Sequence, residues 1–193
     1  MYYRQRVTAL TLPVLVAISL TGCSVLTPPA PEPLTGVAAC ALGHTWKADL
    51  EALSAQVLAG LQRSGVPATE VTASGDLSLD WSVEGHVVLN NDFTLTIKAT
   101  PAADQVLTVV QTYSGEATGA AYINGEVAIP RKWDGSKVSV TAVADNNGAA
   151  VDPVPFGIPN ATFDDSVGLE LTCASGALTT HPRGGQITQT WSS

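Results

Sequence analysis

Apolar and polar residues alternate with a period of two along residues 71–99, and this pattern constrains the fold more than any other feature. Side chains of a strand point alternately to opposite faces, so this period is typical of a strand with one buried face. The turn signal Glu84-Gly85 divides the stretch, and the alternation resumes after the polar break Asn90-Asn91-Asp92. The expected inner-face residues are Val71, Ala73, Gly75, Leu77, Leu79, Trp81, Val83, Phe93, Leu95, Ile97 and Ala99. We therefore expect a hairpin that forms one wall of an antiparallel sheet.

Further short β-rich runs follow this hairpin, separated by turn signals. Asn124-Gly125 and Asp134-Gly135 each predict a tight hairpin turn between two strands. Residues 151–162 contain three prolines, which exclude a central strand and predict a long crossing loop. The alternation of residues 167–174 and the turn signal Ser175-Gly176 indicate late strands near the end of the chain. We expect about eight antiparallel strands connected in sequential order.

Residues 46–63 have the period of an amphipathic helix rather than that of a strand. The residues on its apolar stripe are Trp46, Leu50, Leu53, Val57 and Leu61. Thr45 is placed to cap the first turn, and Gly65 followed by Pro67 marks the end. We expect this helix to precede the sheet and to bury its stripe against it.

A sequential sheet of this size avoids exposed edges most simply by closing into a barrel, and a β-sandwich is the alternative. The chain carries three short motifs, which are Gly43-His44-Thr45-Trp46, Trp133-Asp134-Gly135 and Leu169-Glu170-Leu171-Thr172-Cys173. In these the chain resembles lipocalin-like, calycin-type barrels and, more closely, a group of uncharacterised actinobacterial lipoproteins. The resemblance covers most of residues 40–191 and implies a closed or nearly closed up-and-down barrel. The chain departs from lipocalins because the expected helix directly follows the motif similar to their G-x-W sequence.

The first residues have the layout of a secretory signal. Arg4 and Arg6 precede an apolar run over residues 7–20 that is short for a membrane span. The run ends in Leu20-Thr21-Gly22-Cys23, which resembles the bacterial lipobox. The resemblance implies cleavage before Cys23 and acylation of Cys23 with diacylglyceryl and palmitate-like chains. The alternatives are an ordinary secretory signal that happens to contain a cysteine, or an anchor that is not cleaved.

A multiply acylated Cys23 would hold the chain stably at the outer face of the bacterial cell membrane. Four prolines within residues 27–33 favour an extended spacer after this anchor. The remaining chain is of ordinary size for one domain. We therefore expect a signal peptide over residues 1–22, a lipidated stalk over residues 23–39 and a single domain over residues 40–193.

Two cysteines remain after Cys23, and we expect Cys40 and Cys173 to form a disulfide. An even number of cysteines in an exported, oxidising compartment favours this pairing. Cys173 is in phase with Leu169 and Leu171, on the expected inner face of a late strand. Two buried free thiols are the alternative. A zinc site is disfavoured because His44 is the only histidine close to either cysteine in the sequence.

Charge and motifs argue against several functions. The chain has 9 Lys and Arg against 17 Asp and Glu, which argues against recruitment by nucleic acid or by an anionic lipid surface. It lacks the motifs of common hydrolases, metalloproteases, phosphate-binding loops and dinucleotide folds. We expect solvated histidines at His44, His86 and His181, and ordinary turns at Asp145-Asn146-Asn147-Gly148 and Asp164-Asp165. No catalytic residue, metal or cofactor is predicted.

Two functions remain, and they differ in the free volume beneath the helix. The first is a tethered barrel that binds a small hydrophobic ligand, because Val71, Ala73 and Gly75 are small inner-face residues. Its candidate lining residues are Trp46, Leu79, Trp81, Phe93 and Trp133. The second is a structural or protein-interaction lipoprotein of the envelope, with a filled interior and a Thr-rich outer surface that meets protein partners.

Overall fold

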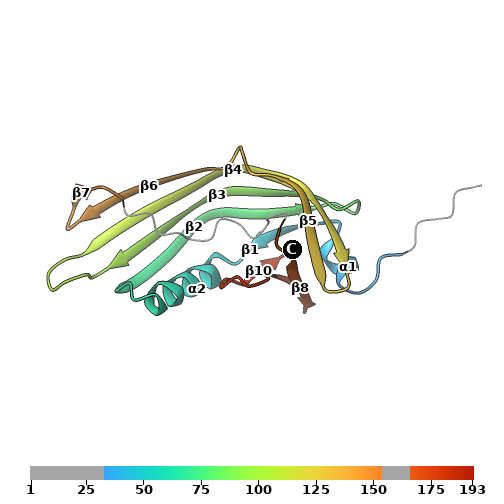
Figure 1. The fold of residues 1–193 in the computed structure, drawn as a ribbon, viewed down its shortest axis with the longest axis horizontal. Coiled ribbons are helices and arrows are strands. Elements are labelled where there is room, and N and C mark those ends of the chain that lie inside the picture. The colour runs from blue at the N-terminus through green and yellow to red at the C-terminus, as the bar shows by residue number, and fades with distance from the viewer. Residues whose placement is uncertain (1–32, 154–165) are drawn as a thin grey trace, which may run out of the picture. The chain divides into compact units, whose positions relative to one another are not determined.

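The computed structural model describes residues 33–153 and 166–193, and its compact unit begins at Leu34. All the strands of this part belong to one antiparallel sheet (Figure 1). The helices are α1 (Gly36–Ala41) and α2 (Leu50–Arg63). The strands are β1 (His44–Ala48), β2 (Ala68–Trp81), β3 (His86–Ala99), β4 (Leu107–Asn124), β5 (Val127–Asp134), β6 (Ser139–Asn146), β7 (Ala149–Val151), β8 (Leu169–Ala174), β9 (Ala177–Pro182) and β10 (Gln189–Ser192). The prediction of a mainly β, antiparallel fold is confirmed.

Eight of these strands pair in a closed ring, in the order β1-β2-β3-β4-β5-β8-β9-β10 and back to β1. Each ring strand is therefore a neighbour of the ring strand before it in the sequence, as expected for an up-and-down connection. The β6–β7 hairpin lies outside the ring and extends the sheet from β4. Figure 1 shows this hairpin at one end of the sheet and β5 and β8 at the other.

The turn signal Asp134-Gly135 does not join two paired strands, which corrects the prediction of a hairpin there. β5 pairs with the second half of β4 and β6 with its first half, so the two lie one after the other along the same edge. β4 bends between these halves at Gly115, which has a φ of 97°. A Cβ on Gly115 would lie 2.1 Å from the backbone oxygen of Lys137, so only glycine fits this close approach.

The expected helix is present but shorter, because it begins at Leu50 rather than at Trp46. Residues His44–Ala48 instead form β1, in which Trp46 pairs with Leu79 of β2. Asp49 caps the helix by accepting a hydrogen bond from the Ala52 N–H at 2.9 Å, so the expected cap at Thr45 is wrong. The apolar position of Trp46 suits both a helical stripe and a strand, and pairing with a distant strand decides between them.

The alternation over β2 and β3 is confirmed with three corrections, of which the first is that Gly75, an expected inner-face residue, is exposed. β3 runs unbroken through the expected polar break, and Asn91 lies buried in phase with the inner-face residues. Its amide donates to the backbone oxygens of Leu89 and Gly115 at 3.4 and 3.3 Å, which satisfies a polar group inside the sheet. Val83 lies in the turn between the strands and is 57% exposed, so it is not an inner-face residue.

The other turns agree with the sequence to within one residue. Asn147-Gly148 and Ser175-Gly176 each form a two-residue turn with positive φ at both positions. The turn after β4 is shifted by one residue from the prediction, because Asn124 still pairs with Val127. Residues 149–151 form β7, and most of the expected crossing loop lies outside the described residues.

Side-chain amides connect α2 to the sheet. Gln56 exchanges two hydrogen bonds with the backbone of Thr188, accepting from its N–H at 2.8 Å and donating to its oxygen at 2.6 Å. Gln62 donates to the backbone oxygen of Ala68 at the start of β2. Leu53 and Val57 are buried in the hydrophobic core, so the apolar stripe of α2 faces the sheet as expected.

Candidate functional site

The residues proposed to line a ligand pocket belong to the packed core. Trp46, Leu79 and Trp81 are 2%, 0% and 1% exposed, and Phe93 is buried beside them in the same hydrophobic cluster. A side chain that water cannot touch does not line a cavity of water size. The largest side chains with less than 2% exposure are Trp81, Trp191, Leu79, Leu89, Leu95, Ile97, Leu169, Leu171, Leu178, Val87, Val109 and Thr180. Apart from Thr180, they belong to the buried hydrophobic core of the sheet together with the proposed lining residues Trp46 and Phe93.

Trp133 is the one proposed pocket residue that is only partly buried, and it packs against the core from β5. A Cβ on Gly119 of β4 would lie 2.7 Å from the Trp133 ring. The indole thus occupies the space that Gly119 leaves free, as a large residue facing a small one.

Two aromatic side chains of β3 and β4 stack on each other, in the half of β4 that pairs with β6. Phe93 of β3 and Tyr113 of β4 are cross-strand partners, and their ring centroids lie 4.6 Å apart with an interplanar angle of 2°. Burial raises the pKa of the Tyr113 phenol above its ordinary value. The phenol is therefore neutral at physiological pH and acts here as a packing group.

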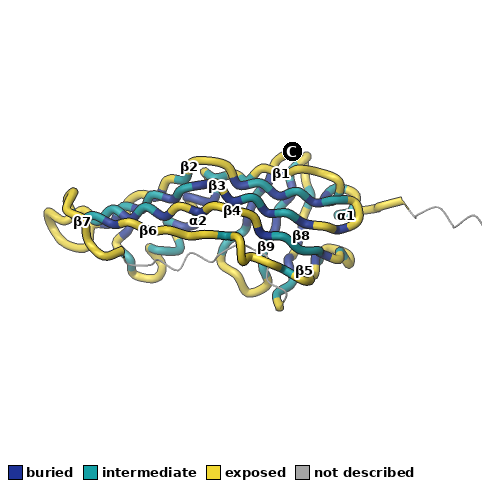
Figure 2. Tube along the Cα trace, turned by 90° about the horizontal axis from the view of Figure 1, so that it is seen from above, coloured by how far each residue is buried: buried dark blue, intermediate teal, exposed yellow. Residues whose placement is uncertain are grey.

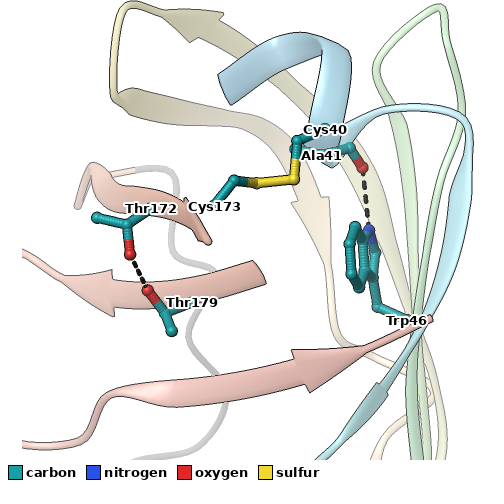
Figure 3. The surroundings of a disulfide bond; sticks show 6 residues. All are labelled: Cys40, Ala41, Trp46, Thr172, Cys173 and Thr179. Carbon is teal, nitrogen blue, oxygen red and sulfur yellow. Dashed lines mark hydrogen bonds between the residues drawn. A yellow bond between two sulfur atoms is a disulfide. The ribbon is translucent and has the colours of Figure 1, made fainter. Parts of the chain in front are cut away.

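The expected disulfide between Cys40 and Cys173 is confirmed. It joins α1 to β8, with the two Cα atoms 6.4 Å apart (Figure 3). The Trp46 indole N–H donates to the Ala41 oxygen at 3.0 Å, which fixes α1 to β1 beside the disulfide. Helix α1 itself has no clear signal in the sequence. Cys23, the proposed lipidation site, lies outside the described residues.

The histidines do not come together. His44 and His86 are exposed at strand ends, and the His181 ring nitrogen Nδ1 lies 3.1 Å from the Thr188 hydroxyl. Within residues 33–153 and 166–193, no three His, Cys, Asp or Glu side chains are placed to hold a metal ion. Asp145 accepts from the Gly148 N–H at 2.9 Å, which is a turn contact, and Asp164-Asp165 lies outside the described residues.

Two exposed carboxylates have lowered pKa values, and both lie in or beside turns. Hydrogen bonds from the Ser136 side chain and backbone N–H lower the pKa of Asp134. Hydrogen bonds from its own backbone and from Ser82 lower the pKa of Glu84. These carboxylates stabilise turns, and a catalytic role would need a second functional group beside them.

The outer face of the sheet presents a row of hydroxyl groups in register across four strands. The row is Ser74, Thr94, Thr112 and Thr141, from β2, β3, β4 and β6. The Thr94 and Thr112 hydroxyls are 3.3 Å apart and hydrogen-bonded. This face is the Thr-rich outer surface that the sequence predicts.

A group of exposed valines gathers around the β6–β7 hairpin, and sequence reasoning missed it. Val106, Val140, Val143 and Val151 are 43%, 42%, 64% and 40% exposed. Figure 2 colours the first part of β6 mainly as exposed. The signal in the sequence is the run of residues 138–144, which lacks charge.

Comparison with known families and proteins does not place the chain. No family model matches it, and no curated protein matches it either. Neither helix of the described ranges is long and apolar enough to cross a membrane.

Proposed function

We propose that this chain is an exported lipoprotein of the bacterial cell envelope, held at the outer face of the cell membrane by an acylated Cys23. The signal-like leader, the sequence Leu20-Thr21-Gly22-Cys23 and the Pro-rich residues 27–33 support this proposal. The disulfide between Cys40 and Cys173 agrees with it, because disulfides persist in exported proteins. The folded unit acts as a structural or protein-interaction module.

The near-complete burial of Trp46, Leu79 and Trp81 is the observation that favours an interaction module over a carrier of small hydrophobic ligands. A carrier needs an apolar cavity of several hundred Å³ to enclose most of a ligand. Leu79, one of the proposed lining residues, is instead fully buried with Trp191 in the hydrophobic core. On this proposal the protein meets its partners through its outer surface.

The anchor is tested by expressing the full chain in a bacterial host and fractionating the cells. We expect the protein in the membrane fraction, with an intact mass that begins at Cys23 and includes the acyl groups. Cys23→Ala should abolish the acyl mass, whereas the neighbouring Ser24→Ala should preserve it. Recovery of the protein in the soluble fraction with an unmodified Cys23 thiol would contradict the anchor.

The filled interior is tested separately with an apolar fluorescent probe such as anilinonaphthalene sulfonate. The native protein should show no saturable binding. Leu79→Ala should open a cavity, lower the free energy of unfolding by about 2–5 kcal/mol and admit a small apolar molecule. The exposed substitution Val143→Ala is the matched control and should change neither property. Saturable binding to the native protein that Leu79→Trp removes would instead support the carrier.

A further inference from the structure

Strand β6 has one edge that is largely unpaired in the described part of the chain. On one side β6 pairs with β4 over its whole length, from Ser139↔Ser114 to Asn146↔Leu107. On the other side it pairs with β7 only through Ala144, Asp145 and Asn146. We call residues 139–143 on this second side the open edge.

The hairpin geometry shows which backbone groups the open edge presents. Asn146 and Ala149 flank a two-residue turn, so they exchange both of their backbone hydrogen bonds. In an antiparallel ladder such pairs alternate, so every second residue of β6 directs its N–H and C=O toward the same side. Val140 and Ala142 therefore direct their N–H and C=O groups to the open edge, while Thr141 directs its groups to β4.

The open edge lacks the sequence features that discourage strand pairing elsewhere in this sheet. Strand β5 also has an unpaired stretch, but it carries Pro130 together with Arg131 and Lys132, and the φ of Lys132 is 52°. Proline, charge and local irregularity all discourage another strand from adding to an edge. Residues 139–143 contain neither proline nor charge, and they expose valines on both faces.

We propose that the open edge pairs antiparallel with the same edge of a second copy of this chain. In the fitting register Val140 faces Ala142 of the second copy, and Thr141 faces Thr141 about a two-fold axis. The N–H and C=O groups of Val140 and Ala142 then all find partners. A register shifted toward Ala144 is blocked because Val151 of β7 already occupies that place.

The side chains of the open edge and the net charge of the chain both support a second copy as its partner. The two Thr141 side chains would extend the hydroxyl row of Thr94 and Thr112 across the axis, and Thr–Thr pairs stabilise neighbouring strands. The chain has a net charge of −8, so two copies repel each other least where they meet along an uncharged strand. A two-fold contact also closes on itself and leaves no free edge for a third copy.

The contact is short, so its occupancy depends on local concentration. Five residues a side bury less area than a stable soluble dimer needs. Confinement to a membrane surface would raise the effective concentration of the copies. The pairing is argued from the open edge of β6 alone. The proposed anchor is a separate claim, and cell fractionation tests it separately.

The test is disulfide cross-linking of the full chain in the cells that export it, under a mild oxidant. Thr141→Cys should yield a covalent dimer, because facing residues of a non-hydrogen-bonded pair have Cα atoms about 4.5 Å apart. Thr112→Cys is the matched control, since it is exposed in the same row but one strand away from the edge. Its two copies would lie about 14 Å apart, beyond the reach of a disulfide. The unaltered chain controls for linkage through Cys23.

A second variant separates edge pairing from random collision. Ala142→Pro removes an N–H that points to the open edge and leaves the hydrogen bonds with β4 in place. Added to Thr141→Cys, it should lower the dimer yield at least about fivefold, because two symmetric hydrogen bonds are lost. The Cys40–Cys173 disulfide and the melting temperature should be retained. The proposal is wrong if Thr141→Cys gives no dimer, if Thr112→Cys gives as much, or if the proline leaves the yield unchanged in a folded chain.

Discussion

Removing the disulfide between Cys40 and Cys173 should lower the free energy of unfolding by up to about 5 kcal/mol. The two cysteines are 133 residues apart, so the bond closes most of the folded unit into a loop. Loop-closure entropy for a loop of this length is about 17 cal/mol/K, which is about 5 kcal/mol at room temperature. This is of the order of the whole stability of a typical domain.

The loss should also be uneven across the sheet. Strands β8, β9 and β10 join the rest of the ring through β5–β8 and β1–β10, and each of these contacts has only two register pairs. The disulfide adds a covalent link from α1 to Cys173 of β8. Without it, amide hydrogen exchange should rise most in β8–β10 and least in β3, which is paired along its whole length on both sides.

The variant Cys40→Ser/Cys173→Ser tests both expectations by guanidinium unfolding and by amide exchange. The native protein under reductant should match the double variant, which controls for the serine hydroxyls. A loss below about 1 kcal/mol would mean that the unfolded chain is already compact or that the bond strains the fold. An equal rise of exchange in β3 and in β8–β10 would refute the local account.

Three further perturbations have definite expected outcomes. Gly115→Ala should lower the free energy of unfolding, measured by heat or denaturant, by at least about 2 kcal/mol, because its Cβ would overlap the facing carbonyl of Lys137. Gly125→Ala is the control with open space around the new Cβ, and it should lower the free energy of unfolding by about 1 kcal/mol. Asp134 has a lowered pKa, so its contribution to stability is present at neutral pH and is lost as the pH falls through that value; Ser136→Ala should raise the Asp134 pKa in an NMR titration. Gln56→Ala should cost about 1–3 kcal/mol by leaving backbone groups before β10 unpaired, with Gln56→Glu losing the donated bond alone.

Local patterns predicted those features that depend on neighbours in the sequence. The inner-face positions of Leu79 and Leu95 follow from alternation alone, because the period of a strand decides each side chain's face. The Ser175-Gly176 turn follows from residues that accept positive φ. The expectation of a disulfide follows from the even number of cysteines after Cys23 and from the expected export of the chain.

The features that sequence reasoning missed depend on residues far along the chain. Trp46 joins a strand because β2 lies beside it, and its own neighbours do not reveal that partner. Asn91 looked like a break in the strand, yet the Gly115 carbonyl satisfies its amide inside the sheet. Leu79 is buried in the same hydrophobic cluster as Trp191, which lies more than a hundred residues away along the chain, so its local sequence does not reveal this neighbour.

Strand β4 gives the protein two regions that can diverge at different rates. Its second half closes the ring through β5, whereas its first half carries β6, which no ring contact requires. Substitutions, insertions or lengthening in the β6–β7 hairpin can therefore accumulate without opening the ring. Among descendants of this chain, the hairpin is where binding partners can be gained or lost, while the buried residues of the ring can change only where the packed volume is kept.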